Sequence, residues 1–180
     1  MGTKIQLMEL TVGAVFKVGE HDFIVLEQMD GQTAVISKDF MAENVVFDGN
    51  TRDYNKSNLK NVIETEIQPA IEEAVGAGNL IEHEVTLTSV DMQNEFGKCR
   101  CKVRPITFDE ARKYNDLLVN NDLDDWWWTL TPWSTEERGW KWSITVVSPG
   151  GLIRWGICIG LSGVRPFCIL KSDIFVSKGE

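Results

Sequence analysis

Tryptophan is confined to one quarter of this chain. All seven tryptophans lie between residues 126 and 170, beginning with the run Trp126-Trp127-Trp128, and the rest of the sequence holds none. An indole combines a large apolar area, a flat stacking face and one N–H donor, so this crowding indicates a dense core or a recognition surface. We expect both, with the leading run in the core. The other four are expected on loops and hairpins that reach solvent: Trp133, Trp140, Trp142 and Trp155.

Length and hydropathy predict one globular domain spanning residues 1–180. A chain of 180 residues with 43% hydrophobic side chains can bury a sizeable core. No apolar run approaches the ~20 residues that a membrane-spanning helix needs. Residues 1–10 lack the basic start, apolar stretch and cleavage site of a secretory signal. The sequence therefore predicts neither membrane insertion nor export by the general route.

The net charge of −9 is unevenly distributed. Residues 1–125 carry 12 Lys/Arg and 23 Asp/Glu, whereas residues 126–180 carry 6 Lys/Arg and 4 Asp/Glu. An acidic body repels a phosphate backbone, so nucleic acid is not an expected partner. The tryptophan-rich segment is the least acidic part, and its arginines and indoles suit an anionic or sugar ligand.

The cysteines do not have the spacing of a zinc site. Cys99 and Cys101 are separated by one residue, Cys158 and Cys168 lie far away, and the chain has only two histidines. We expect buried or free thiols, with a redox or copper role for Cys101 as the alternative. The sequence suggests no cofactor.

Three aspartates precede the tryptophan run: Asp122, Asp124 and Asp125. Clustered carboxylates can bind calcium, but the glycine and terminal glutamate of an EF-hand loop are missing here. A solvated connector is the expectation, and calcium is the alternative.

The first 125 residues predict a β meander followed by helices. Apolar runs at 14–18, 23–27 and 33–37, separated by Gly19-Glu20-His21-Asp22 and Asp30-Gly31, predict three strands within residues 1–50. Apolar residues at helical spacing over 59–75 predict a helix capped by Ser57 or Asn58. Pro69 is expected to divide it near Gln68, and Gly76-Ala77-Gly78 to end it.

A strand at 81–88 and a second helix follow. His83 lies between Glu82 and Glu84 and is expected on the strand surface, with general-base catalysis as the alternative. Thr107 and Glu110 form a capping box for a helix that runs to about Leu118. Residues 126–180 read as a C-terminal antiparallel β segment, with strands at 126–130, 141–147, 152–159, 167–170 and 174–177. The predicted class is α+β.

This order of elements resembles a family of small phage and prophage proteins of gut bacteria, catalogued as a domain of unknown function. The matching pieces include Phe23-Ile24-Val25-Leu26-Glu27, Tyr54-Asn55-Lys56-Ser57-Asn58-Leu59, Trp126-Trp127-Trp128-Thr129-Leu130-Thr131-Pro132 and Gly163-Val164-Arg165-Pro166-Phe167. The tryptophan block followed by Gly-Val-Arg-Pro also resembles the C-type-lectin fold in its formylglycine-generating-enzyme branch. The variable proteins of diversity-generating retroelements, often phage receptor-binding proteins, share that branch.

The resemblance implies a C-type-lectin-like fold in which Trp126 and Trp127 are buried and Arg165-Pro166 closes the segment. It implies that the surface of residues 129–162 faces a ligand, namely a protein or glycan on a cell surface. It places the protein in a phage virion or the bacterial cytoplasm. The residues presented outward would be Trp133, Arg138, Trp140, Trp142, Arg154 and Trp155. The Glu-Pro-Asn and Trp-Asn-Asp tripeptides of calcium-dependent lectins are absent.

These observations favour a non-enzymatic binding module, because a few aromatic and arginine anchors dominate most interfaces. The first alternative is a structural virion or assembly protein whose exposed tryptophans form an oligomer contact. The second is an enzyme, either an oxidase that uses Cys158 and Cys168 or a hydrolase that uses His83. Adenine-directed mutagenesis of Asn-type codons does not create tryptophan, so in a diversified version Trp140, Trp142 and Trp155 would be fixed or would come from other codons.

Overall fold

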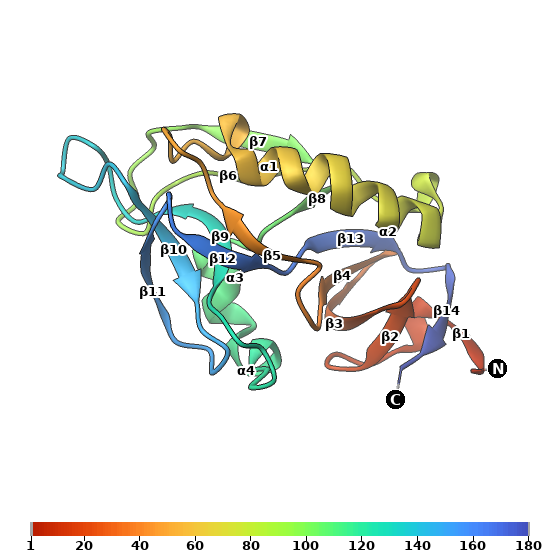
Figure 1. Ribbon diagram of the computed structural model, residues 1–180. Helices are drawn as coiled ribbons and strands as arrows, with labels where there is room; N and C mark the ends of the chain where they lie inside the picture. The colour runs from red at the N-terminus through yellow and green to blue at the C-terminus, as the bar shows by residue number, and fades with distance from the viewer. Residues whose placement is uncertain (1, 180) are drawn as a thin grey trace.

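The computed structural model describes residues 2–179 and shows an α+β protein with three sheets and one long helix that lies along one side of the molecule (Figure 1). The largest sheet has seven strands in the order β1-β14-β2-β3-β4-β13-β8. Their bounds are β1 (Lys4–Gln6), β2 (Val15–Val18), β3 (His21–Met29), β4 (Gln32–Ser37), β8 (Val103–Arg104), β13 (Phe167–Lys171) and β14 (Phe175–Lys178).

The predicted N-terminal meander is confirmed as β2, β3 and β4. Phe16 pairs with Phe23 and Ile24 with Ile36, so the apolar side chains of the hairpins share faces of the sheet. Gly19 and Gly31 occupy the turns with φ of +61° and +71°, a backbone conformation that glycine adopts without steric cost. Strand β1, which was not predicted from the sequence, pairs with β14 beside the two chain ends (Figure 1).

The second sheet has five strands in the order β11-β10-β9-β12-β5. Their bounds are β5 (Ala42–Val46), β9 (Trp127–Pro132), β10 (Ser143–Val147), β11 (Ile153–Ile157) and β12 (Leu161–Val164). All pairs are antiparallel except the contact of β12 with β9, which is parallel. Figure 1 shows β11 at the end of the molecule opposite both chain termini.

The five strands predicted over residues 126–180 are confirmed as β9, β10, β11, β13 and β14, but they do not form one antiparallel unit. Strands β9 to β12 belong to the five-stranded sheet, whereas β13 and β14 join the N-terminal meander. The chain changes sheets at Arg165-Pro166, because Val164 pairs with Ala42 of β5 and Phe167 pairs with Ile36 of β4. Pro166 has no N–H to contribute to a ladder, and its carbonyl instead accepts from the Ser37 amide at 3.0 Å.

The predicted long helix is present, and it is divided just before Pro69, as expected. It consists of α1 (Asn58–Val62), a π-helical turn (Ile63–Ile67) and α2 (Gln68–Val75). The Ser57 side chain caps its start by accepting from the Lys60 amide, and Gly76 ends it with φ of +87°. Pro69 lacks an N–H and crowds the preceding turn, and the wider π turn before Gln68 accommodates it.

The remaining elements are short. Strands β6 (His83–Thr86) and β7 (Lys98–Cys101) form a hairpin. The capping box of Thr107 and Glu110 is confirmed at the start of α3 (Phe108–Lys113), and a break at Tyr114 separates α3 from α4 (Asn115–Leu118). Residues 2–179 also contain three 3₁₀ turns, η1 (Leu7–Glu9), η2 (Tyr54–Lys56) and η4 (Ala77–Asn79).

Each face of the five-stranded sheet packs against a different core. One face, with Trp128, Ile144 and Val146, joins the core that contains the long helix. The other, with Trp127 and Val147, packs against Ala111, Tyr114 and Leu118 of the short-helix region, and we call it the α3 face. None of the helices within residues 2–179 is long and apolar enough to cross a membrane.

Candidate ligand-binding surface

The tryptophan run supplies one buried residue to each core. Trp127 is fully buried on the α3 face beneath Arg165, whose guanidinium carbon lies 4.8 Å from the ring centroid. Trp128 is buried on the opposite face, where its indole N–H donates to the Val45 carbonyl at 2.8 Å. Both therefore anchor the sheet in the interior.

Trp126 is not fully buried, which differs from the expectation for the first tryptophan of the run. It precedes β9 at the margin of the sheet and is only half-buried. Its ring is covered by the guanidinium of Arg154 on β11, 4.1 Å from the ring centroid. Since an arginine stacked on an indole gains a cation–π attraction, Arg154 is held flat against the protein.

Trp133, Trp140 and Trp155 form a continuous row of three rings. The centroids of Trp133 and Trp140 are 6.5 Å apart, and those of Trp140 and Trp155 are 5.7 Å apart, both in edge-to-face geometry. Trp155 pairs with Thr145 on the α3 face of the sheet, whereas Trp133 and Trp140 belong to the loop between β9 and β10. We call these three side chains the indole row.

The indole row leads into an open hollow of about 420 Å³ at the end of β10 and β11. Trp142 and Trp155 border this hollow, and each keeps 42% of its surface exposed. Its other lining residues are Gly49, Ser143, Ile157 and Ile159. We call it the Trp142 hollow. Its lining is apolar apart from the Ser143 hydroxyl and backbone groups, so it suits an apolar or aromatic ligand group.

The loop that carries Trp133 and Trp140 is held by a buried arginine. The Arg52 side chain donates through Nε to the Lys141 carbonyl at 2.6 Å and through Nη1 to the Ser134 carbonyl at 2.6 Å. Its Nη2 donates to Glu95 at 2.5 Å, and the guanidinium also lies 5.3 Å from the ring centroid of Phe96. Arg52 thus fixes both ends of the loop.

Two carboxylates of the loop that precedes β7 add further ties. Glu95 accepts from the Glu136 amide at 2.8 Å, and Asp91 accepts from the Ser134 hydroxyl at 2.5 Å and from Arg138 at 2.8 Å. Desolvation raises the pKa of Asp91, but the hydrogen bonds from Ser134, Ser89 and Arg138 outweigh it and lower the pKa to about 2. Asp91 is therefore an anion that holds the loop at neutral pH.

Of the six predicted site residues, the four tryptophans come together, and each of the two arginines contacts a different partner. Trp133, Trp140 and Trp155 form the indole row, and Trp142 meets Trp155 at the hollow. The two arginines lie elsewhere: Arg154 stacks on Trp126, and Arg138 pairs with Asp91. Sequence reasoning missed Arg52, Asp91 and Glu95, because their contacts span 41 to 89 positions and leave no local pattern.

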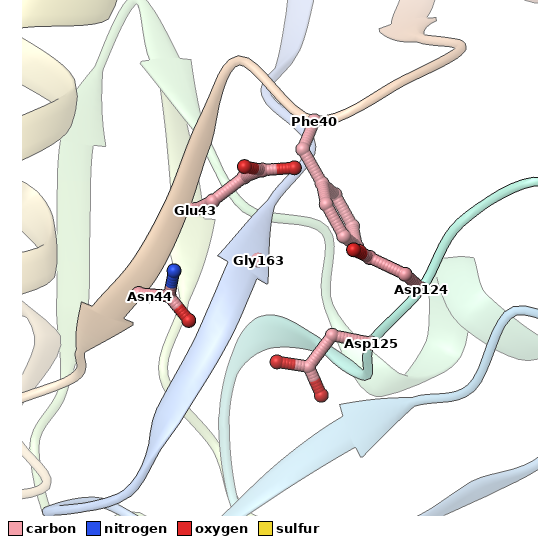
Figure 2. A pocket seen from close by; sticks show the side chains of 6 residues that line it. All are labelled: Phe40, Glu43, Asn44, Asp124, Asp125 and Gly163. Carbon is pink, nitrogen blue, oxygen red and sulfur yellow. The ribbon is translucent and has the colours of Figure 1, made fainter.

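A second hollow of about 200 Å³ lies between β5 and the loop before β9 (Figure 2). Figure 2 shows the carboxylates of Glu43, Asp124 and Asp125 around the ring of Phe40. Asp122 does not line it, so the three aspartates are not brought together. Among the described residues, no three His, Cys, Asp or Glu side chains are grouped as metal ligands. The calcium alternative therefore gains no support from this hollow.

None of the candidate catalytic groups is among the residues that line the Trp142 hollow. Cys158 and Cys168 are fully buried, and burial raises the pKa of both thiols, that of Cys168 to about 12. His83 is not the exposed strand residue that we expected. The His83 side chain is half-buried, and its Nε2 accepts a hydrogen bond from Arg104 Nε at 2.9 Å. The same Arg104 side chain forms a bidentate pair with Glu110.

No protein-family model, curated protein or solved structure matches this chain.

Proposed function

We propose that this protein is a non-enzymatic ligand-binding module of phage or prophage origin that binds through the surface of residues 129–162. The observation that carries the proposal is the indole row, which leads from the β9–β10 loop into the Trp142 hollow. Exposed tryptophans gathered around a concave apolar site are typical of binding energy concentrated in a few anchors.

The fixed loop supports this proposal. A binding surface that is ordered before the ligand arrives loses less conformational entropy on binding. Arg52, Asp91 and Glu95 hold the loop of Trp133 and Trp140 through backbone and side-chain hydrogen bonds. The tryptophans are therefore presented by a rigid support.

The ligand that fits best is a protein on a cell surface, and a glycan is the second candidate. The Trp142 hollow offers isoleucine and tryptophan side chains and one serine hydroxyl, which suits an apolar side chain of a protein partner. A glycan would instead stack on the indole faces of Trp142 and Trp155 and would need polar partners at the rim.

The phage origin and the C-type-lectin-like fold remain part of this proposal and rest on the resemblance of the sequence pieces. That resemblance also suggests a variable receptor-binding protein of a diversity-generating retroelement. The test is genetic: the neighbouring DNA would hold a reverse-transcriptase gene and a near-copy of the codons for residues 129–165 that differs at adenines. Its absence leaves an unvaried binding protein.

Binding to intact bacterial cells tests the function. The protein, labelled at its N-terminus far from β11 (Figure 1), would be titrated onto a panel of gut bacteria and measured by flow cytometry. We expect saturable binding to some strains, weakened at least about tenfold by Trp142→Ala or Trp155→Ala, as for interface anchors. Protease or periodate treatment of the cells distinguishes a protein ligand from a glycan.

Phe175→Ala is the matched control, because Phe175 is exposed but lies on β14 in the other sheet. It should leave cell binding unchanged. Binding of the Trp142→Ala and Trp155→Ala variants as tight as that of the unmodified chain would contradict the proposal. Failure to bind any strain, together with large assemblies of the free protein, would favour the structural virion alternative.

A further inference from the structure

Strand β11 is an open edge of the five-stranded sheet. It pairs with β10 alone, in a register that joins Thr145 to Trp155. Just beyond the two ends of this ladder, the Cys158 amide donates to Trp142 and the Ser148 amide donates to Leu152. Since hydrogen-bonded and open residues alternate along an antiparallel strand, residues 154 and 156 also face β10. The amides and carbonyls of Ile153, Trp155 and Ile157 therefore point away from the sheet.

The opposite edge of the same sheet is protected, whereas β11 is not. Strand β5 carries Glu43, has Asn44 at φ of +52°, and shifts register against β12. A charge and a distorted backbone are the usual features that prevent an edge strand from pairing with another chain. Strand β11, with the sequence Ile-Arg-Trp-Gly-Ile, has no proline and no bulge, and its one charged side chain, Arg154, is stacked on Trp126. Its free edge is suited to accept a further strand.

We propose that a second copy of this chain occupies the edge, with the two β11 strands antiparallel about a twofold axis at Trp155. In this register Trp155 faces Trp155 of the second copy, and Ile153 faces Ile157 of the second copy. These are the residues whose backbone groups point outward, so reciprocal hydrogen bonds form at each pair. The carbonyl of Ile157 already accepts from Gly160 at 2.9 Å and retains a second lone pair.

The side chains of β11 fit this register on both faces of the sheet. On the α3 face, isoleucine meets isoleucine and indole meets indole, and such cross-strand apolar pairs are stabilising. On the other face, Arg154 meets Gly156 of the second copy, which has no side chain to obstruct it. The stacking of Arg154 on Trp126, at 4.1 Å, keeps the two guanidinium groups directed back over their own chains.

The charge distribution also favours a second copy at this edge. Two molecules of net charge −9 repel each other, and the repulsion is least where acidic side chains are absent. Residues 141–172 contain no aspartate or glutamate, and this stretch includes the whole of β10 and β11. The strands at this edge thus carry no acidic side chain that would oppose a second acidic body.

Sedimentation velocity over a micromolar concentration series tests the dimer. We expect the unmodified chain to reach twice its monomer mass, and Ile157→Lys to remain monomeric because it places an ammonium against Ile153 of the second copy. Leu161→Lys is the matched control: Leu161 is 55% exposed against 48% for Ile157, but it lies on β12. It should dimerise like the unmodified chain.

An unmodified chain that stays monomeric overturns the proposal and leaves the edge free for a strand of another protein. A dimer that survives Ile157→Lys, or that Leu161→Lys disrupts equally, places the contact elsewhere. The inference does not depend on the proposed ligand, since sedimentation needs none. An unmodified chain that dimerises but binds none of the bacterial strains would therefore reject the proposed function alone.

Cysteine cross-linking tests the register. Facing residues of a hydrogen-bonded pair have Cα atoms about 5.5 Å apart, within the range of a disulfide. A mixture of Ile153→Cys and Ile157→Cys chains, each checked for dimerisation, should form a covalent dimer on mild oxidation. Either variant alone should not, because its own cysteines are offset along the strands. All native cysteines are buried and do not interfere. If each single variant cross-linked as well as the mixture, the register in which Trp155 faces Trp155 of the second copy would be refuted.

Discussion

The indole of Trp140 lies edge-on to that of Trp155, with ring centroids 5.7 Å apart and an interplanar angle of 65°. One ring comes from the β9–β10 loop and the other from the edge strand β11. The contact therefore joins the loop to the sheet, and it makes the stability of the loop depend on the same side chains that we propose for binding.

A double-mutant cycle at these two positions should show favourable coupling. Edge-to-face aromatic pairs contribute about 0.5–1.5 kcal/mol beyond their buried area. We expect Trp140→Ala and Trp155→Ala each to lower the free energy of unfolding by about 1–2 kcal/mol, because both rings remain partly exposed. Trp127→Ala, which empties a fully buried site, should cost about 3–5 kcal/mol. Urea unfolding of the single variants and of the Trp140→Ala/Trp155→Ala double variant measures these losses, and additive losses at residues 140 and 155 would argue against the contact.

Removing the Arg52 guanidinium should release the β9–β10 loop. Arg52→Met leaves the carbonyls of Ser134 and Lys141 and the carboxylate of Glu95 without their donor, so we expect a loss of about 2–4 kcal/mol. Hydrogen exchange at residues 134–141 should accelerate at least about tenfold more than exchange in the seven-stranded sheet.

Arg138→Met is the matched control for that prediction. Arg138 lies on the same loop and pairs with Asp91, but both side chains are partly exposed, so the loss should stay below about 1 kcal/mol. Equal effects of the two substitutions would mean that surface charge, and not the buried guanidinium, orders the loop.

The protein should lose stability as the pH falls below about 6.5, and His83 is the cause. Burial, followed by the neighbouring charge of Arg104, lowers the pKa of His83 from its ordinary value. The unfolded chain therefore takes up a proton at higher pH than the folded chain, so the stability that the neutral imidazole provides is present above pH 6.5 and is lost as the pH falls through the folded pKa. Its Nε2, which accepts from Arg104, cannot do so when protonated.

His83→Gln should flatten this part of the profile, because an amide oxygen accepts from Arg104 without titrating. Unfolding free energies at pH 5 and 7.5 provide the comparison. A second loss is expected below about pH 4.5, because Glu110 has a lowered pKa. Burial raises that pKa, but the hydrogen bonds from Arg104 and Thr107 outweigh it.

The four thiols should not react in the native state. Each cysteine is buried, and burial raises the pKa of Cys158 and Cys168, which keeps them in the unreactive thiol form. Titration with an aromatic disulfide reagent should detect four reactive thiols only after the protein is unfolded in guanidinium chloride. Rapid modification of Cys158 and Cys168 in the folded protein, with stoichiometric copper(I) binding, would revive the oxidase alternative.

Local chemistry made several elements predictable from the sequence. Turn glycines located the hairpins of β2, β3 and β4, and the capping box of Thr107 and Glu110 located α3. The spacing of apolar residues located the long helix, and Pro69 located its division at Gln68. Each of these signals acts over a few residues, so the residues themselves carry the information.

Long-range pairing could not be predicted in the same way. Strand β5 reads as a polar, turn-rich stretch, because its Glu43 and Asn44 lie at a sheet edge and only the pairing with β12 makes it a strand. The distribution of β9 to β14 between two sheets likewise depends on partners from the first 46 residues. Trp126 was expected to be buried with its neighbours, but the strand starts one residue later and leaves it at the margin.

The atoms of the β9–β10 loop that Arg52 grips are carbonyl oxygens of Ser134 and Lys141. Every amino acid has a backbone carbonyl, so these two hydrogen bonds do not depend on which side chains the loop carries. Exposed positions such as Glu136 and Glu137 can therefore be exchanged while the loop keeps its shape. Natural selection or protein design can thus vary the exposed side chains of this loop without changing how it folds.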